Sequence, residues 1–257
     1  MTNVLVCIKR VPDSSGEVLL ADDDMTVDAR YVGYTVSPHE ECAVELAIGV
    51  AKVTGGEATV LTLGGEDSLE QVRDALAVGC NAAVRIDADA DRFGPADVAA
   101  AVADVVREHE ARGTTYDLVL LGNDAADTGD FQVGVRLAYA LGRPVVTGIS
   151  TLEVSGTTMT ARGDGPAGTE VFEVDLPAVA TVLEGGVSPR YPSIPGRMKA
   201  KRAPVATVAP AGEPGGGGRV RLKLPPAQPS QVEVLGQGAD AAPAVVDLLQ
   251  ELGVVSR

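Results

Sequence analysis

DLVLLGNDAADTGDFQVG, residues 117–134, is the stretch that decides the predicted fold. It opens with an apolar run, as expected for a strand covered on both faces of a parallel sheet. Gly122, Gly129 and Gly134 follow, and glycine allows close backbone approach or a positive φ angle. The loop leads into a helix predicted for residues 131–141, whose free N–H groups and dipole suit a phosphate. The pattern is neither GxGxxG nor a Walker motif, so a nucleotide site and an ordinary polar loop with a helix cap both remain open.

The same alternation of strand and helix runs through the first 150 residues. Apolar runs and helical periodicity predict, in chain order, a strand at 3–8, a helix at 38–54, a strand at 58–63, a helix at 68–78, a strand at 83–86, a helix at 95–112 and the strand at 117–122. Such alternation gives parallel strands joined by right-handed crossovers. The predicted fold class is therefore α/β, a doubly wound, mostly parallel, Rossmann-like sheet.

The second half of the chain changes character. Residues 149–163 and 168–177 alternate as an antiparallel hairpin does, and the apolar run from 178 is expected to return to the sheet. EPGGGG at 213–218 is typical of a flexible linker. We expect a domain over 1–204 and a Gly/Pro-rich arm over 205–257 that docks on another molecule, because the arm is too small to form its own core. Three shorter elements are also predicted: a hairpin at 21–28, a strand at 219–224 and a helix at 239–253.

Charge and cysteine content exclude several classes of protein. The formal net charge of -15 argues against a nucleic-acid binder, which needs a cationic surface. Cys7, Cys42 and Cys80 form no CxxC pair, which indicates structural thiols in a reducing compartment and no metal site. No apolar run approaches the ~20 residues of a membrane span. We therefore expect a cytoplasmic protein without membrane insertion.

Three predicted strands end in loops whose residues could contact a ligand. In open parallel sheets, ligands bind at the carboxyl ends of the strands, where the strand order reverses. The three strand ends are Cys7 to Lys9, Leu63 to Gly65, and the 121–134 loop. His39 opens a helix at the same end, whereas His109 lies late in a helix that is expected to face solvent. Catalytic motifs such as GxSxG or HExxH are missing from the sequence. A binding or carrier protein is therefore favoured over a self-sufficient enzyme.

RYPSIPGRMKAKRAP, residues 190–204, contrasts with the acidic chain because it has five basic residues and no acidic one. A solvated surface loop is the plain interpretation. The alternative is a recognition loop, since Ile194 stands between Pro192 and Pro195 and a stiff apolar tip can fill a partner's pocket at little ordering cost.

Six segments in collinear order resemble the beta subunit of electron transfer flavoproteins. They are VLVCIKRVPD (4–13), SPHEECAVELA (37–47), RDALAVGCNAAVRI (73–86), LLGNDAADTGDFQVG (120–134), LPAV (176–179) and PRYPSIPGRMKAKR (189–202). The chain also departs from the family pattern. Ser14 and His39 stand where relatives often have aromatic side chains near the flavin, and Val187-Ser188 replaces an Asn-Glu pair. The resemblance is thus to a divergent member.

The resemblance implies a carrier without bond-making chemistry of its own. It implies a heterodimer with an alpha subunit, an FAD shared between the subunits, and an AMP in beta, or a second FAD there in a bifurcating branch. Donor dehydrogenases would supply electrons and a quinone oxidoreductase would accept them. By position, the nucleotide site would comprise Cys7, Ser37, Pro38, His39, Glu40, Leu63, Gly122, Asn123, Asp127, Thr128, Gly129, Gln132, Val133 and Gly134. The partner-binding residues would be Arg190, Tyr191, Ile194, Pro195, Met198, Lys199 and Arg202.

Two other hypotheses remain open from the residues alone. One is a stand-alone ATP-binding domain with a universal-stress-like α/β fold, which leaves the 189–202 segment unexplained. The other is an α/β nucleotide-dependent ligase, which the missing pyrophosphate loop disfavours.

Overall fold

The computed structural model describes residues 1–13, 15, 18–226 and 232–255. Ser14 lies outside the described residues. The chain divides into a compact unit, Met1–Leu222, and a small C-terminal unit, Lys223–Arg257. The first unit contains the sheet and the candidate site. The second contains one α-helix among its described residues, α6 (Ala242–Glu251), preceded by a short 3-10 helix.

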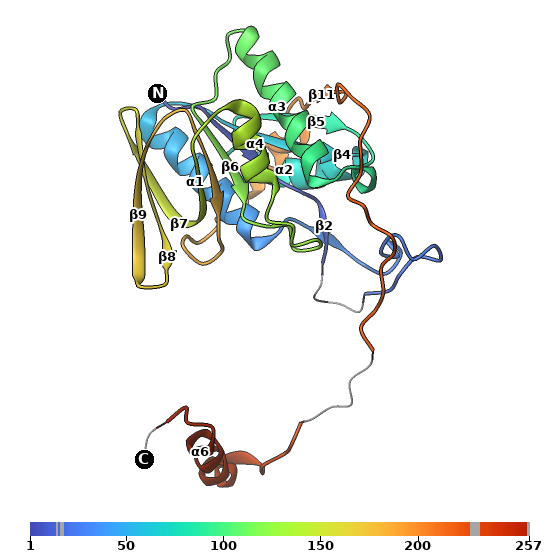
Figure 1. The fold of residues 1–257 in the computed structure, drawn as a ribbon, viewed down its shortest axis with the longest axis vertical. Coiled ribbons are helices and arrows are strands. Elements are labelled where there is room, and N and C mark those ends of the chain that lie inside the picture. The colour runs from blue at the N-terminus through green and yellow to red at the C-terminus, as the bar shows by residue number, and fades with distance from the viewer. Residues whose placement is uncertain (14, 16–17, 227–231, 256–257) are drawn as a thin grey trace. The chain divides into compact units, whose positions relative to one another are not determined.

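Within the described residues, nine strands form one sheet in the order β11-β5-β4-β1-β6-β10-β7-β8-β9 (Figure 1). Its parallel part consists of β11 (Ala206–Val208), β5 (Ala82–Asp87), β4 (Ala58–Gly64), β1 (Val4–Cys7), β6 (Leu118–Gly122), β10 (Ala178–Val182) and β7 (Val145–Ser155). Its antiparallel part adds β8 (Thr158–Gly165) and β9 (Gly168–Asp175) to β7. A separate two-stranded pair joins β2 (Val11–Pro12) to β3 (Tyr34–Thr35).

The chain order places a reversal in the middle of the sheet. After β1 the chain passes through α1 (Pro38–Thr54) to β4 and through α2 (Leu69–Val78) to β5, both on one side of β1. It then returns through α3 (Pro95–Ala111) to β6 on the other side of β1. The switch point between β1 and β6 is where an open parallel sheet binds ligands.

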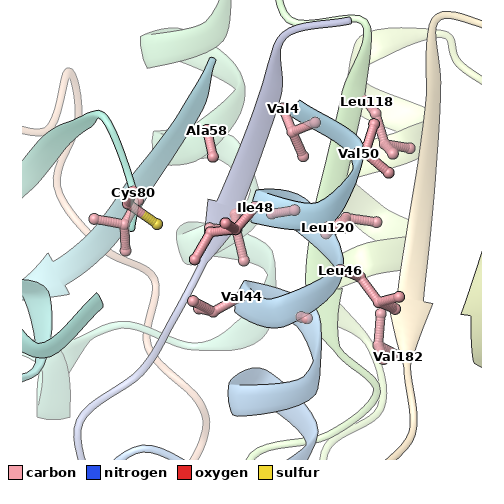
Figure 2. Close-up of a cluster of buried hydrophobic side chains, with 14 of the residues drawn as sticks. Val4, Val44, Leu46, Ile48, Val50, Ala58, Cys80, Leu118, Leu120 and Val182 are labelled. Atoms are coloured by element: carbon pink, nitrogen blue, oxygen red, sulfur yellow. The ribbon is translucent and has the colours of Figure 1, made fainter. Parts of the chain in front are cut away.

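Helices cover both faces of the sheet because the side chains of each strand alternate between the faces. Val4 and Val6 of β1 join the core under α1 and α2, whereas Leu5 and Cys7 join the core under α3 and α4 (Val133–Leu141). Figure 2 shows the first of these cores, where Val50 of α1 lies near Leu118 of β6 and Leu46 of α1 lies near Val182 of β10. β1 and β6 are apolar, and β4 is apolar apart from Thr59 and Thr62, because both faces of these strands are buried.

The doubly wound α/β class and the antiparallel hairpin are confirmed. Residues 178–182 do return to the sheet, between β6 and β7. The 21–28 segment is a turn closed by an antiparallel bridge from Leu20 to Val27.

Two expectations for the region after residue 204 are wrong. Residues 206–208 form the edge strand β11, paired in parallel with β5. Residues 219–224 form no strand, and β11 already occupies the β5 edge of the sheet that they could have joined. Instead, Leu222 donates its N–H to the Asp24 carbonyl.

The glycine-rich segment at 213–218 is also more tightly held than a flexible linker would be. The carboxylate of Asp97 accepts backbone N–H groups from Gly94, Gly215 and Gly216 at 2.8–3.0 Å. These three hydrogen bonds hold the pKa of Asp97 below its usual value. The segment therefore runs along the N-terminus of α3 in a fixed path.

The basic stretch differs from the expected loop as well. Ser193 caps a helix, α5 (Ile194–Arg202), by accepting the Gly196 N–H on its hydroxyl at 3.1 Å. Pro195 falls in the first turn, where its missing N–H costs nothing. Ile194 is therefore the first residue of a helix, and the basic side chains follow on that helix.

Candidate functional site

The carboxyl ends of β1 and β6 bring most of the predicted site residues together. Cys7 ends β1 opposite Leu121, one residue before Gly122 ends β6. Leu63 lies near the end of the neighbouring strand β4, with its side chain in the core under α3 and α4. The N-termini of α1 and α4 lie at this same edge, because each helix follows the loops that leave it.

The N-terminus of α1 is built around a buried carboxyl group. Ser37 is the N-cap and Pro38 the first helical residue. The backbone N–H and the hydroxyl of Ser37 both donate to Oε2 of Glu40, at 3.3 and 3.2 Å. Burial raises the pKa of Glu40 to about 8, against the lowering effect of Ser37 and Lys9. Glu40 is therefore largely neutral at neutral pH.

Cys7 lies beside this carboxyl group, and it too is held in its neutral, protonated form. Burial, with a smaller contribution from Glu40, raises the pKa of Cys7 to about 12. The thiol thus stays protonated, as expected for a structural cysteine. All three cysteines are free and buried.

Gly122 is the point where the backbone of β6 comes closest to α1. A Cβ atom at this position would lie 2.6 Å from Cγ of Glu40 and 3.2 Å from Cβ of His39. A larger residue would displace the start of α1, so this position requires glycine.

His39 connects two loops of the site. Its Nδ1 accepts the backbone N–H of Glu184, after β10, at 3.1 Å, which leaves the proton of the neutral ring on Nε2. That Nε2 lies 3.0 Å from Oδ1 of Asp124 in the loop after β6. The N–H bond at Nε2 does not point at that oxygen directly enough to form a hydrogen bond. Asp124 Oδ1 is thus buried without a hydrogen-bond partner among the described residues. A buried acceptor that receives no hydrogen bond suits a donor group on a ligand.

The loop after β6 is fixed at its start and in its middle. Lys9, just past β1, pairs with Asp127 at 2.8 Å. The hydroxyl of Thr181 donates to Asn123 Oδ1 at 2.7 Å, and the Asn123 N–H donates to the Val182 carbonyl. Phe131 has a φ of 54°, which is unusual for a bulky residue and stores strain where the loop turns into α4.

The remaining predicted residues are divided between this loop and the core. Thr128, Gly129 and Gln132 are exposed, and Gln132 accepts from Arg136 one turn further along. Val133 opens α4. Gly134 is buried against β10, since a Cβ there would lie 2.3 Å from Cγ2 of Thr181.

Four residues that hold the site together are missing from the predicted set of site residues, although two of them lie in the predicted segments 7–9 and 121–134. Lys9, Asp124, Thr181 and Glu184 make the contacts described above from three separate strand ends. The signal for Lys9 was its charge immediately after a buried strand, at a strand end that the sequence had already indicated. The contacts of Thr181 and Glu184 span 58 and 145 residues of sequence, which local patterns do not reveal.

A second group of predicted residues lies on and before α5, far along the chain. Tyr191, Ile194 and Met198 are large apolar side chains that are exposed. Lys199 and Arg202 are also exposed, in the last turn, and Pro195 lies in the first. Arg190 makes a two-pronged ion pair with Glu45 of α1, at 2.7 and 2.5 Å.

The described residues lack two kinds of feature. Their His, Cys, Asp and Glu side chains include no group of three or more that could hold a metal ion. Among the same residues no helix has both the length and the apolar character needed to cross a membrane.

Comparisons with known proteins agree with this arrangement. The electron transfer flavoprotein domain family matches residues 24–212. The chain is similar to the electron transfer flavoprotein subunit beta of Bacillus subtilis, with 36% identity over 79% of this chain and 77% of the relative. It is 35% identical to that of Syntrophomonas wolfei over 90% and 89% of the two chains, and 31% identical to that of Megasphaera elsdenii over 96% of each. The chain therefore belongs to the beta subunit family of electron transfer flavoproteins.

Proposed function

We propose that this chain binds AMP at the β1/β6 switch point and completes an FAD site together with an alpha subunit. The heterodimer would carry electrons from donor dehydrogenases to a quinone oxidoreductase. The chemistry that FAD supplies when bound is reversible electron uptake, while the protein provides binding, orientation and electrostatics.

The observation that carries the AMP proposal is Asp124 Oδ1, a buried acceptor that lies beside His39 Nε2 but accepts no hydrogen bond among the described residues, two positions after the bare backbone of Gly122. An adenine amine or a ribose hydroxyl could donate to that oxygen. The N-terminus of α4 would suit the phosphate, because its free N–H groups lie at the same edge of the sheet. The Lys9–Asp127 pair would hold the loop in place around the nucleotide.

The nucleotide proposal is tested by extraction from the purified heterodimer. Asp124→Ala should lower the AMP content and leave the FAD content unchanged. Asp130→Asn, at an exposed position of the same loop, is the matched control and should keep both. Retention of AMP in Asp124→Ala would contradict the role of that oxygen. Two FAD molecules and no AMP in the wild-type heterodimer would indicate a bifurcating-type site instead.

The C-terminal unit, Lys223–Arg257, is proposed to dock on the alpha subunit through α6. Val245, Leu248 and Leu252 recur at helical spacing and are at least 40% exposed. A helix with an open apolar stripe gains stability by burying that stripe against a partner. Leu248→Asp should weaken alpha–beta association in size-exclusion chromatography, whereas Asp247→Asn should not.

We also propose that α5 is the surface that donor dehydrogenases recognise. The exposed side chains of Ile194 and Met198 would enter an apolar depression on the partner. The basic residues of α5 would steer an acidic surface towards it, in a chain that is otherwise strongly acidic. Ile194→Ala should slow electron transfer from the cognate dehydrogenase without changing FAD content. Unchanged turnover would remove this role from Ile194.

A further inference from the structure

The helix α5 is too short and too basic to be stable by itself. It has nine residues, among them one glycine, three basic residues in its last turn and no acidic residue in its first turn. Isolated helices shorter than roughly 12–15 residues are marginal in water. Its shape must therefore come from contacts with the rest of the domain.

Arg73 of α2 holds the C-terminal end of α5. Its Nη1 donates to the carbonyl oxygens of Ala200 and Lys201, at 2.6 and 3.1 Å. The last four carbonyls of a helix lack partners within it, and α5 has no C-terminal glycine to provide a compact cap, since Ala203 is extended. The cation of Arg73 also suits the negative end of the helix dipole.

Glu45 of α1 holds the segment that leads into α5. Its carboxylate accepts the backbone N–H of Arg190 at 3.2 Å and two guanidinium N–H groups at 2.7 and 2.5 Å. Paired, charge-assisted bonds of this kind are the stronger hydrogen bonds in proteins. Accordingly, the Arg190 side chain holds the pKa of Glu45 below its usual value. The guanidinium of Arg190 thus faces its own domain.

The middle of α5 packs directly on the end of α2. A Cβ at Gly196 would lie 2.4 Å from the carbonyl oxygen of Ala77, so glycine permits this close approach. Ala200, four residues later, is 2% exposed and belongs to the core. Small residues therefore define the inner face of α5.

The opposite face of the helix is apolar and open. Ile194 is 78% exposed and Met198 is 62% exposed, and a spacing of four residues places both side chains on one face. Arg202 follows four residues later and is also exposed. The three contacts with α1 and α2 therefore fix the direction in which Ile194, Met198 and Arg202 point.

We propose that Glu45 and Arg73 are positioning residues that hold α5 so that Ile194 and Met198 reach a partner together. This inference rests on the proposed role of α5 in recognising donor dehydrogenases. It specifies the partner's site as a groove that takes one helical turn, bordered by carboxylates near Arg202, rather than as a pocket for a single aliphatic side chain.

The test measures electron transfer from the donor dehydrogenase to the heterodimer, with the heterodimer as the varied substrate. Glu45→Ala and Arg73→Gln should each raise KM about tenfold, since each removes charge-assisted hydrogen bonds. The kcat, the FAD content and the melting temperature should stay near those of the wild type. A KM effect without a kcat effect separates positioning of the docking helix from damage to the flavin site.

Three further variants complete the design. Arg73→Lys can still donate one hydrogen bond and should regain part of the affinity. The exchange Glu45→Arg with Arg190→Glu should also restore part of it, because it keeps the ion pair but leaves the backbone N–H of residue 190 without its acceptor. Arg107→Gln is the matched control, because Arg107 also donates to the carbonyl of another helix, Ala140 at 2.5 Å, but lies on α3, which covers the other face of the sheet. It should leave KM unchanged.

The outcomes distinguish this inference from the recognition role itself. A KM that rises for Ile194→Ala but stays unchanged for Glu45→Ala and Arg73→Gln overturns only the positioning inference. Losses of melting temperature and FAD that parallel the KM effect, without rescue by Arg73→Lys, also overturn it. An unchanged KM in Ile194→Ala overturns the recognition role of α5.

Discussion

The variant Glu40→Gln should change how the free energy of unfolding depends on pH. Glu40 is buried at the start of α1, and its pKa is raised from 4.5 to about 8. Glutamine has nearly the same shape and keeps an oxygen that can accept from Ser37. The substitution therefore removes the titration and leaves the local packing almost unchanged.

The sign follows from where the proton is bound. Between pH 4.5 and 8 the folded chain keeps the Glu40 proton, whereas the unfolded chain has lost it. The contribution of Glu40 to stability is thus fully present below its unfolded pKa and is lost as the pH rises towards the folded pKa. The loss amounts to about 1.4 kcal/mol per pH unit, or roughly 4 to 5 kcal/mol across the window as an upper bound.

Urea unfolding of the full-length chain at pH 5, 6, 7 and 8 measures this effect. The difference in free energy of unfolding, Glu40→Gln minus wild type, should grow by about 1 kcal/mol per pH unit towards pH 8. All other titrating groups are common to both proteins and cancel in this difference. Glu57→Gln, at an exposed position, is the control and should show no trend. A pH-independent difference for Glu40→Gln would refute a buried, neutral Glu40.

Three shorter predictions concern the packing around the site and the C-terminal arm. Gly122→Ala should lower the free energy of unfolding by about 1–3 kcal/mol, because the added Cβ would lie 2.6 Å from Cγ of Glu40. Gly49→Ala, in α1, should instead raise it by up to about 1 kcal/mol, because the added Cβ would meet no atom within 4 Å. Calorimetry on both variants tests the contrast. Leu120→Ala, in the fully buried centre of β6, should cost about 2–5 kcal/mol in urea unfolding, and a loss below 1 kcal/mol would contradict the packing in Figure 2. Asp97→Asn should speed proteolytic cleavage within residues 213–219, because it weakens the hydrogen bonds from the N–H groups of Gly215 and Gly216. Mass spectrometry of the fragments measures the cleavage rate, and an unchanged rate would show that Asp97 does not hold the segment.

The elements that the sequence predicted well are those with a strong local pattern. The apolar runs of β1, β4 and β6 could be located because buried parallel strands are apolar throughout. Ser37 and Pro38 marked the start of α1 correctly. Because parallel strands end at one edge, the strand ends alone predicted that Cys7 and Gly122 would lie close together.

The parts that could not be predicted depend on contacts between distant residues. β11 has only three residues, none of them buried, so it has no periodicity, and its pairing with β5 spans more than 100 residues. The 213–218 segment has the composition of a linker, yet Asp97 fixes it from the start of α3. Similarly, α5 owes its helical shape to Arg73 and Glu45, whereas its prolines and glycine had indicated a loop.

Co-expression of the full-length chain with a matching alpha subunit, followed by nucleotide extraction, tests the central claim most directly. We expect a yellow heterodimer that contains one FAD and one AMP. A chain that never joins a flavin-bearing alpha subunit, and forms a colourless homo-oligomer instead, would contradict it.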